Sequence, residues 1–136
     1  MTFQSKPLRL APLILVIVGV MFVALGASTI AHPEIMERYG IAAPDAHAKS
    51  TIIAVIGGAE LGLGMFLLFG RRLGVTMPAQ IYSMLFLFAG ILSARIISVF
   101  IFLPELPPVF FRELFIELAI AGTLGYLAYQ FNENIS

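Results

Sequence analysis

Residues 51–70 read TIIAVIGGAELGLGMFLLFG and hold a single charged residue, Glu60, among apolar and glycine residues. A helix of roughly 20 mostly apolar residues is long enough to cross the hydrocarbon core of a bilayer. A carboxylate within such a helix is costly unless it faces other helices and finds a partner there. The stretch therefore predicts a membrane-spanning helix that packs a polar side chain inside a bundle.

Three further stretches have the length and composition of membrane spans, at residues 11–31, 79–103 and 109–131. The first of them is uncharged, the second contains Arg95, and the last contains Glu113 and Glu117. Prolines, which end or begin helices, lie next to the last two spans. Together with residues 51–70, these stretches predict one all-α domain over residues 1–136, an integral membrane four-helix bundle.

The composition excludes several classes of protein. Apolar residues make up 60% of the 136 residues and charged residues only 12%, and the mean hydropathy is +0.98. A soluble domain of this size needs more charge to cover its surface. The net charge of zero provides no basic surface for nucleic acid, and the absence of cysteine excludes disulfides and thiolate metal sites.

No motif for nucleotide binding, serine-nucleophile catalysis or zinc-protease catalysis occurs in the chain. We therefore predict no catalytic residue, no metal and no cofactor, and regard an enzymatic function as unsupported by any motif. His32 and His47 lack the tight spacing of metal ligands, so they are interpreted as ordinary loop residues.

Basic residues near the span ends predict the orientation of the chain in the membrane. Four of them fall on one side of the predicted bundle: Lys6, Arg9, Arg71 and Arg72. On the other side, the loop of residues 32–50 mixes basic with acidic residues. Both termini are therefore predicted to be cytoplasmic, in a multi-pass protein of the bacterial inner membrane.

The same loop contains PEIMERY, residues 33–39, followed by Gly40. Proline near a first turn and glycine after the last turn are typical of a short helix. Because Ile35, Met36 and Tyr39 are its apolar members, we expect this helix to lie along the membrane surface.

Three charged residues lie at a similar predicted depth in separate spans. Glu60, Arg95 and Glu117 are each eight or nine residues from the same membrane boundary, which corresponds to roughly 12–14 Å of helix. Their helices could therefore bring them together as one buried Glu–Arg–Glu polar layer with a buried salt bridge.

Glycines beside Glu60 predict close helix packing. Gly57 and Gly64 lie on nearly the same helical face as Glu60. Gly58 and Gly62 form a second stripe of small residues on nearly the opposite face. This helix is therefore predicted to pack on two sides.

On the last span, Glu113 and Glu117 share a face at four-residue spacing. Arg95 could bridge the two carboxylates, or Arg112 could neutralise the shallower one. Ser98 lies near Arg95 by helical phase. The candidate ligand-binding residues are thus Glu60, Arg95, Glu117, Glu113 and Ser98.

These residues allow three interpretations, which the sequence leaves open. The polar layer could fix helix register, could bind a lipid head group or small molecule, or could couple to proton or ion movement.

Within GGAELGLGMFLLF and ARIISVF, the motif residues are Gly57, Gly58, Gly62, Gly64, Arg95 and Ser98, with Glu117 following in the last span. In these residues the chain resembles the bacterial membrane family called domain of unknown function 4345 and, more distantly, DoxX-like proteins. The resemblance covers roughly residues 13–128. It implies a four-helix integral membrane protein and no particular activity.

The function predicted from the sequence is that of a non-enzymatic membrane protein, either an accessory subunit or a binder of lipid or another small hydrophobic ligand. Its expected partners are membrane lipid and either another membrane protein or a second copy of the chain. The alternative is a small proton-coupled transporter that uses Glu60 or Glu117. A third possibility is a membrane enzyme acting on a lipid-like substrate, with the same carboxylates as acid and base.

Overall fold

A computed structural model describes residues 6–133 of the chain, and the regular elements in that range are all helical. Four helical segments are long and apolar enough to cross a membrane: Leu10–Ala31, Ala46–Leu73, Met77–Glu105 and Pro108–Glu133. The predicted all-α class is confirmed, and each of the four predicted spans falls within one of these helical segments. The side chains of Lys6 and Arg9, which helped to predict the orientation, lie outside the described part.

The chain divides into two compact units, which are described separately. The first unit, Pro12–Thr76, contains most of α1 (Lys6–Ala31), then η1 (Pro33–Tyr39), α2 (Ala46–Thr51), η2 (Ile52–Gly57), α3 (Gly58–Phe69) and η3 (Gly70–Leu73). The second contains α4 (Met77–Phe102), η4 (Leu103–Glu105) and α5 (Pro108–Glu133), with the start of α1 up to Ala11. The single four-helix bundle over residues 1–136 stays a prediction.

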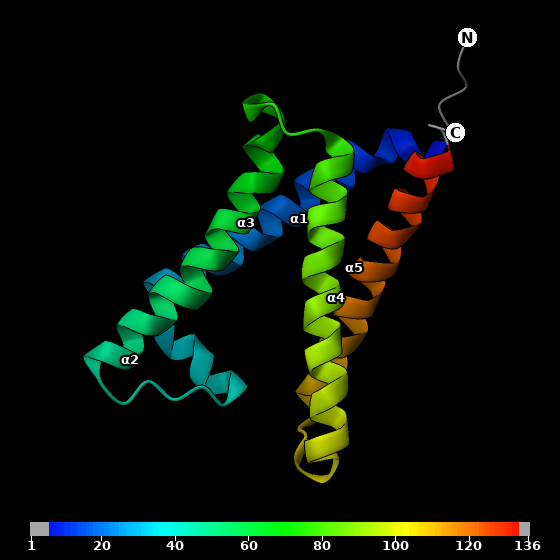
Figure 1. Cartoon of the computed structure of the whole chain (residues 1–136). Helices are drawn as coiled ribbons and strands as arrows, with labels where there is room; N and C mark the ends of the chain where they lie inside the picture. The colour runs from blue at the N-terminus through cyan, green and yellow to red at the C-terminus, as the bar shows by residue number, and fades with distance from the viewer. Residues whose placement is uncertain (1–5, 134–136) are drawn as a thin grey trace. The chain divides into compact units, whose positions relative to one another are not determined.

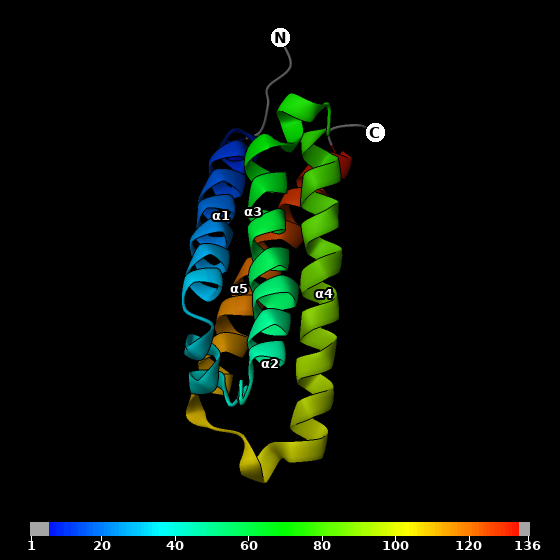
Figure 2. The same cartoon turned by 90° about the vertical axis from the view of Figure 1, so that its left-hand side faces the viewer.

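In the second unit, α4 and α5 form an antiparallel hairpin (Figures 1 and 2). Each helix has 26 residues, or about 39 Å at 1.5 Å per residue, which exceeds the hydrocarbon thickness. Pro108 is the first residue of α5, a position where its missing N–H costs no hydrogen bond. Near the far end of the hairpin, the Tyr82 hydroxyl donates to the carbonyl oxygen of Ala128 at 3.5 Å.

In the first unit, α1 and α3 run antiparallel and approach each other at glycines. A Cβ atom added to Gly26 would lie 2.5 Å from the backbone nitrogen of Leu61 and 2.7 Å from the carbonyl oxygen of Gly57. A Cβ on Gly64 would lie 2.6 Å from the nitrogen of Val23. Since these neighbours are backbone atoms, no side-chain movement relieves such contacts. Glycine is therefore what allows the two helices to come this close.

The helix from α2 to α3 is interrupted by a π-helical turn, η2, in which the N–H of Gly58 donates to the carbonyl oxygen of Ile53. In an uninterrupted α-helix, Ile52 and Gly57 would point about 140° apart. A π turn holds an extra residue and reduces this angle by several tens of degrees. As a result Ile52 contacts the loop that follows α1, while Gly57 contacts α1 itself.

The loop between α1 and α2 folds onto the π turn. Residues 33–39 form the predicted short helix, η1, and Gly40 ends it with a φ of 77°. Met36 is buried with Ala43 and Ile52, so this apolar residue packs against the protein's own helix. The expected position of the segment along a membrane surface stays a prediction, and only Tyr39 of its three apolar members is exposed.

The second span begins five residues earlier than predicted. The side chain of Asp45 accepts a hydrogen bond from the backbone N–H of Ala48 at 2.8 Å and caps α2. The first turn of this helix is polar, and hydropathy therefore placed the start at residue 51. Backbone hydrogen bonding determines where a helix starts. The helix can therefore begin in polar residues that precede the apolar, membrane-spanning part.

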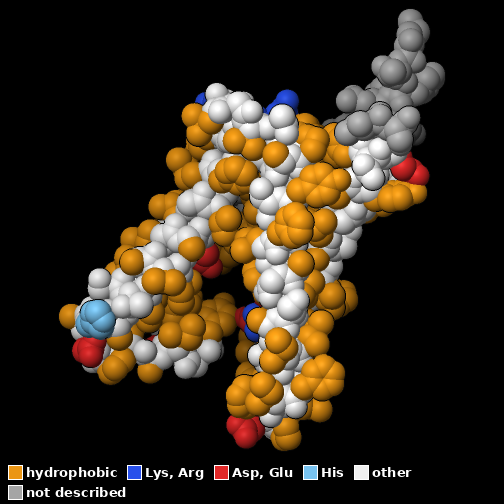
Figure 3. All heavy atoms as spheres, viewed as in Figure 1, with side chains coloured by type: hydrophobic (Ala, Val, Ile, Leu, Met, Phe, Trp, Pro, Cys, Tyr) orange, Lys and Arg blue, Asp and Glu red, His pale blue; other side chains and the backbone are white. Residues whose placement is uncertain are grey.

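Apolar side chains are distributed over the whole face drawn in Figure 3, and charged side chains are sparse on it. The exposed large apolar residues include Ile17, Val55, Phe86, Phe100 and Phe115, which lie on all four spans. An apolar surface of this extent is unfavourable in water. It is the surface expected of helices that have lipid as their solvent.

Candidate functional site

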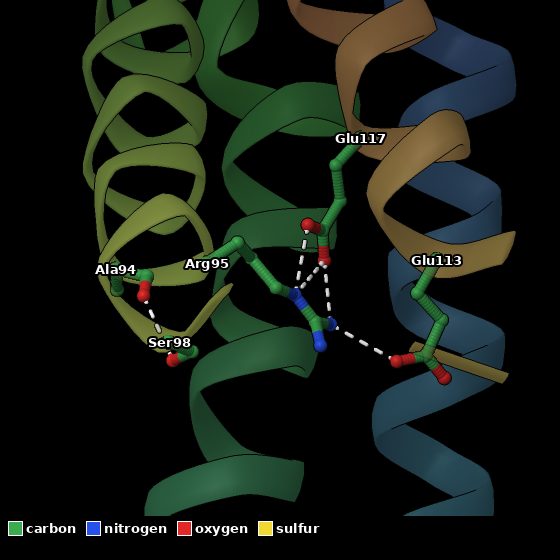
Figure 4. A network of polar contacts seen from close by, with 5 residues as sticks. All are labelled: Ala94, Arg95, Ser98, Glu113 and Glu117. Carbon is green, nitrogen blue, oxygen red and sulfur yellow. Dashed lines mark hydrogen bonds and ion pairs between the residues drawn. The ribbon is translucent and has the colours of Figure 1, made fainter. Parts of the chain in front are cut away.

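The α4–α5 hairpin carries an ion-pair network centred on Arg95 (Figure 4). Arg95 Nε donates to Glu117 Oε1 at 3.3 Å and to Glu117 Oε2 at 3.0 Å. Arg95 Nη2 donates to Glu117 Oε1 at 2.9 Å and to Glu113 Oε2 at 3.0 Å. Of the two alternatives that the sequence left open, the structure therefore has the one in which Arg95 bridges the two carboxylates. This network of Glu113, Arg95 and Glu117 is called the arginine cluster below.

An aromatic ring lies against the guanidinium group of the arginine cluster. The Cζ atom of Arg95 lies 4.9 Å from the centre of the Phe110 ring, within the range of a cation–π interaction. Phe110 is buried and precedes Glu113 and Glu117 at the three- and seven-residue spacings of one helical face. Phe110 was not predicted as a site residue, although that spacing was the available signal.

The predicted buried salt bridge is wrong in one respect, the burial. The side chains of Arg95, Glu113 and Glu117 keep 25%, 21% and 16% of their surface exposed. Two antiparallel helices can enclose a long side chain only in part, because each helix covers one side of it. The arginine cluster is therefore partly open in this structure.

Ser98 lies one turn beyond Arg95 on α4, but its hydroxyl donates to the carbonyl oxygen of Ala94 at 2.9 Å (Figure 4). This bond within one helix is common for serine in apolar helices. It draws the hydroxyl away from the carboxylates, so the structure does not bring Ser98 into the network.

Glu60 belongs to the other unit and has a different partner. The hydroxyl of Thr29, on α1, donates to Glu60 Oε2 at 3.3 Å. Thr29 is buried and Glu60 is partly buried. Within the described part of the Pro12–Thr76 unit, Glu60 makes no ion pair. Because Arg95 and Glu60 lie in separate units, the predicted three-residue layer stays a prediction.

Thr29 was not predicted as a partner of Glu60. The available signal was the pair of polar residues Ser28 and Thr29 near the end of an otherwise apolar span, which lie at the depth of Glu60 when the two helices run antiparallel.

The four glycines predicted to pack helices lie in different surroundings. Gly57 and Gly64 lie against α1, with Ile30 and Val23 as their nearest side chains. Gly58 has only its own helix nearby, and open space surrounds the Cβ position of Gly62. Within the first unit, α3 therefore packs on one side, and the second packed face stays a prediction.

His32 lies near an acidic side chain, and neither histidine belongs to a metal-binding cluster in the described part of the chain. Among residues 6–133, no group of three or more His, Asp or Glu side chains is placed to hold a metal ion. His32 Nδ1 lies 3.2 Å from Glu34 Oε1, and both side chains are exposed. A backbone hydrogen bond at Glu34 lowers the pKa of this carboxyl below its ordinary value, and His32 contributes a smaller lowering.

These features define a class: an all-helical protein with four helices that are long and apolar enough to cross a membrane, and with charged side chains inside them. No protein-family model, curated protein or solved structure matches the chain. The resemblance to domain of unknown function 4345 and to DoxX-like proteins therefore stays a prediction.

Proposed function

We propose that the chain is a multi-pass protein of the bacterial inner membrane that binds a lipid or a small hydrophobic ligand with a polar group at the arginine cluster. In this proposal both termini are cytoplasmic, with the exposed Arg71 and Arg72 on that side. The binding is non-enzymatic. The protein acts as a monomer, as a homodimer, or as an accessory subunit of another membrane protein.

The unequal use of the polar atoms in the arginine cluster supports this proposal. Three of the four hydrogen bonds of Arg95 go to Glu117 and one goes to Glu113. Arg95 Nη1 and Glu113 Oε1 have no protein partner in the described part of the unit. A cluster with only a structural role is expected to satisfy its polar atoms, since unsatisfied ones are costly away from water. The remaining donor and acceptor are available to a ligand.

The binding proposal predicts that the bound amphiphile is lost when the charge of Arg95 is removed. The double variant Arg95→Gln/Glu117→Gln removes one charge of each sign and so preserves the balance. Each lost charge-assisted hydrogen bond costs about 1.5–3 kcal/mol, so retention is expected to fall about tenfold or more. The measurement is mass spectrometry of lipids and small molecules extracted from the full chain purified in a mild detergent.

The matched control is Arg112→Gln, which removes an exposed arginine of the same helix. It is expected to keep the co-purifying amphiphile. Equal retention in the wild type, the double variant and the control would contradict ligand binding at the arginine cluster.

Proton-coupled transport at Glu60 is the second candidate function. The observation that favours it is the hydroxyl partner of Glu60, Thr29, in a unit that provides it with no ion pair in its described part. Carboxylates inside membrane-spanning helices are recurrent members of proton relays in pumps and transporters. Such a group can bind and release a proton as its surroundings change.

The transport candidate predicts that Glu60→Gln abolishes proton-driven flux in vesicles reconstituted with the full chain. The reason is that glutamine keeps the shape of the side chain and cannot titrate. The measurement is the fluorescence of a pH-sensitive dye inside the vesicles, and Glu34→Gln in the exposed loop is the control. Identical flux with the wild type, Glu60→Gln and empty vesicles would argue against transport.

A further inference from the structure

The two carboxylates of the arginine cluster accept different numbers of hydrogen bonds from Arg95. Glu117 receives hydrogen bonds on both oxygens, two from Nε and one from Nη2 of Arg95. Glu113 receives one hydrogen bond, on Oε2, at 3.0 Å. Because Glu117 is engaged on both oxygens, it neutralises Arg95. Glu113 shares the same arginine through a single hydrogen bond, so one arginine faces two carboxylates and the cluster keeps one formal negative charge.

The free atoms of the cluster belong to the two groups that one hydrogen bond joins. Arg95 Nη1 is bonded to the same carbon as Nη2, and Glu113 Oε1 is bonded to the same carbon as Oε2. Those two partners, Nη2 and Oε2, are 3.0 Å apart. Figure 4 shows the third guanidinium nitrogen pointing away from Glu117 and the second oxygen of Glu113 pointing away from Arg95. A ligand that engages both atoms therefore needs two polar groups of opposite character separated by a short linker.

The free atoms are a cationic donor, Arg95 Nη1, and an anionic acceptor, Glu113 Oε1, so they favour a ligand with one anionic and one cationic group. Resting on the proposed function, we propose that the arginine cluster takes a head group with an ammonium next to a phosphate, as in phosphatidylethanolamine. The ammonium donates to Glu113 Oε1 and balances its charge. The phosphate accepts from Arg95 Nη1, since guanidinium groups are well suited to phosphate oxygens.

Depth and charge both agree with this head group. Glu113 is five residues from the start of α5, roughly 8 Å along the helix, a depth that polar head groups reach when the bilayer adapts locally. A lipid that carries a phosphate without an amine would place a second negative charge beside Glu113. The site therefore disfavours anionic lipids and favours the zwitterion.

The test is native mass spectrometry of the delipidated full chain in detergent with two added lipids of equal acyl chains. Phosphatidylethanolamine is expected to be retained about tenfold more than phosphatidylglycerol, a ratio that corresponds to about 1.4 kcal/mol. Glu113→Gln is expected to remove this preference, because it lowers the retention of phosphatidylethanolamine and relieves the repulsion that disfavours phosphatidylglycerol. Arg112→Gln is the control and should keep the preference. Soluble phosphoethanolamine, added as a competitor, distinguishes a free head group from a lipid as the source.

Two results would overturn the proposal: equal retention of the two lipids by the wild type, or an unchanged preference in Glu113→Gln. If binding still depends on Arg95 and Glu117 in that case, only the head-group class is wrong. If the Arg95→Gln/Glu117→Gln variant binds as the wild type does, the binding function at the arginine cluster is itself wrong. Circular dichroism of each variant checks that the helices are intact.

Discussion

Gly26→Ala is expected to lower the free energy of unfolding of the Pro12–Thr76 unit by about 2–3 kcal/mol, the upper part of the range for overpacked contacts. The added methyl group would lie 2.5 Å from the backbone nitrogen of Leu61 and 2.7 Å from the carbonyl oxygen of Gly57. Neither atom belongs to a flexible side chain. Helices α1 and α3 must therefore separate along their length, and the contacts at neighbouring positions weaken with them.

The separation has a second consequence further along the same interface. Thr29 lies three residues after Gly26, and its hydroxyl bond to Glu60 is already long at 3.3 Å. If the helices move apart, this bond is lost and the carboxylate is left without a partner in its unit. An unsatisfied acid at membrane depth adds to the steric cost.

The matched control is Gly62→Ala, on the opposite side of α3. Apart from its chain neighbours and the backbone of its own helix, no atom of the described residues lies within 4 Å of a Cβ at Gly62, and alanine is a better helix former than glycine by up to about 1 kcal/mol. This variant is expected to be neutral or slightly stabilising. Titration with a denaturing detergent, followed by circular dichroism, measures both variants. Equal unfolding midpoints for Gly26→Ala and Gly62→Ala would show that the close approach of α1 and α3 does not stabilise the unit.

The glycine interface also shows what the sequence could predict about the fold. Long apolar runs and the prolines that bound them were enough to predict four spans, because the bilayer allows few alternatives to a helix. Gly57 and Gly64 stood out because they flank a charge. Their partners Gly19 and Gly26 lie in an uncharged span, where no residue marks which face of the helix meets a neighbour.

The π turn and the helix cap could not be predicted from the pattern of apolar residues. The π turn at Ile52–Gly57 lies in the run IIAVIG, which consists of apolar and glycine residues. Without a polar residue to mark one face, the run does not show whether the helix has an α or a π period. The cap at Asp45 precedes the apolar run, so hydropathy excluded it. Both features depend on hydrogen bonds between backbone and nearby groups, and hydropathy does not describe these.

At the candidate site, residue spacing indicated that Arg95 could pair with both carboxylates, but it did not indicate how exposed these side chains are. The four-residue interval between Glu113 and Glu117 placed two carboxylates on one face, which a single arginine from an antiparallel helix can reach. The exposure of the cluster depends on how many elements surround it. That number follows from tertiary packing, and a sequence pattern along one helix does not contain it.

Arg95→Gln is expected to destabilise the α4–α5 hairpin by about 2 kcal/mol, between the ~0–1 kcal/mol of exposed ion pairs and the ~3–5 kcal/mol of breaking buried ones. The intermediate figure follows from the partial exposure of Arg95 and Glu117, at 25% and 16%. Removal of the guanidinium leaves Glu113 and Glu117 facing each other without a cation. It also removes the contact of Arg95 with the ring of Phe110.

The double variant Arg95→Gln/Glu117→Gln separates the charge from the shape of the side chains. Two glutamines can hydrogen-bond to each other, and the cluster keeps the net charge of the wild type because one charge of each sign is removed. Most of the stability lost in Arg95→Gln should therefore return, and detergent unfolding of the wild type, both single variants and the double variant measures the coupling. Arg112→Gln, which removes an exposed charge from α5, should unfold as the wild type does. Additive effects of Arg95→Gln and Glu117→Gln would mean that the hydrogen bonds between these side chains contribute no stability.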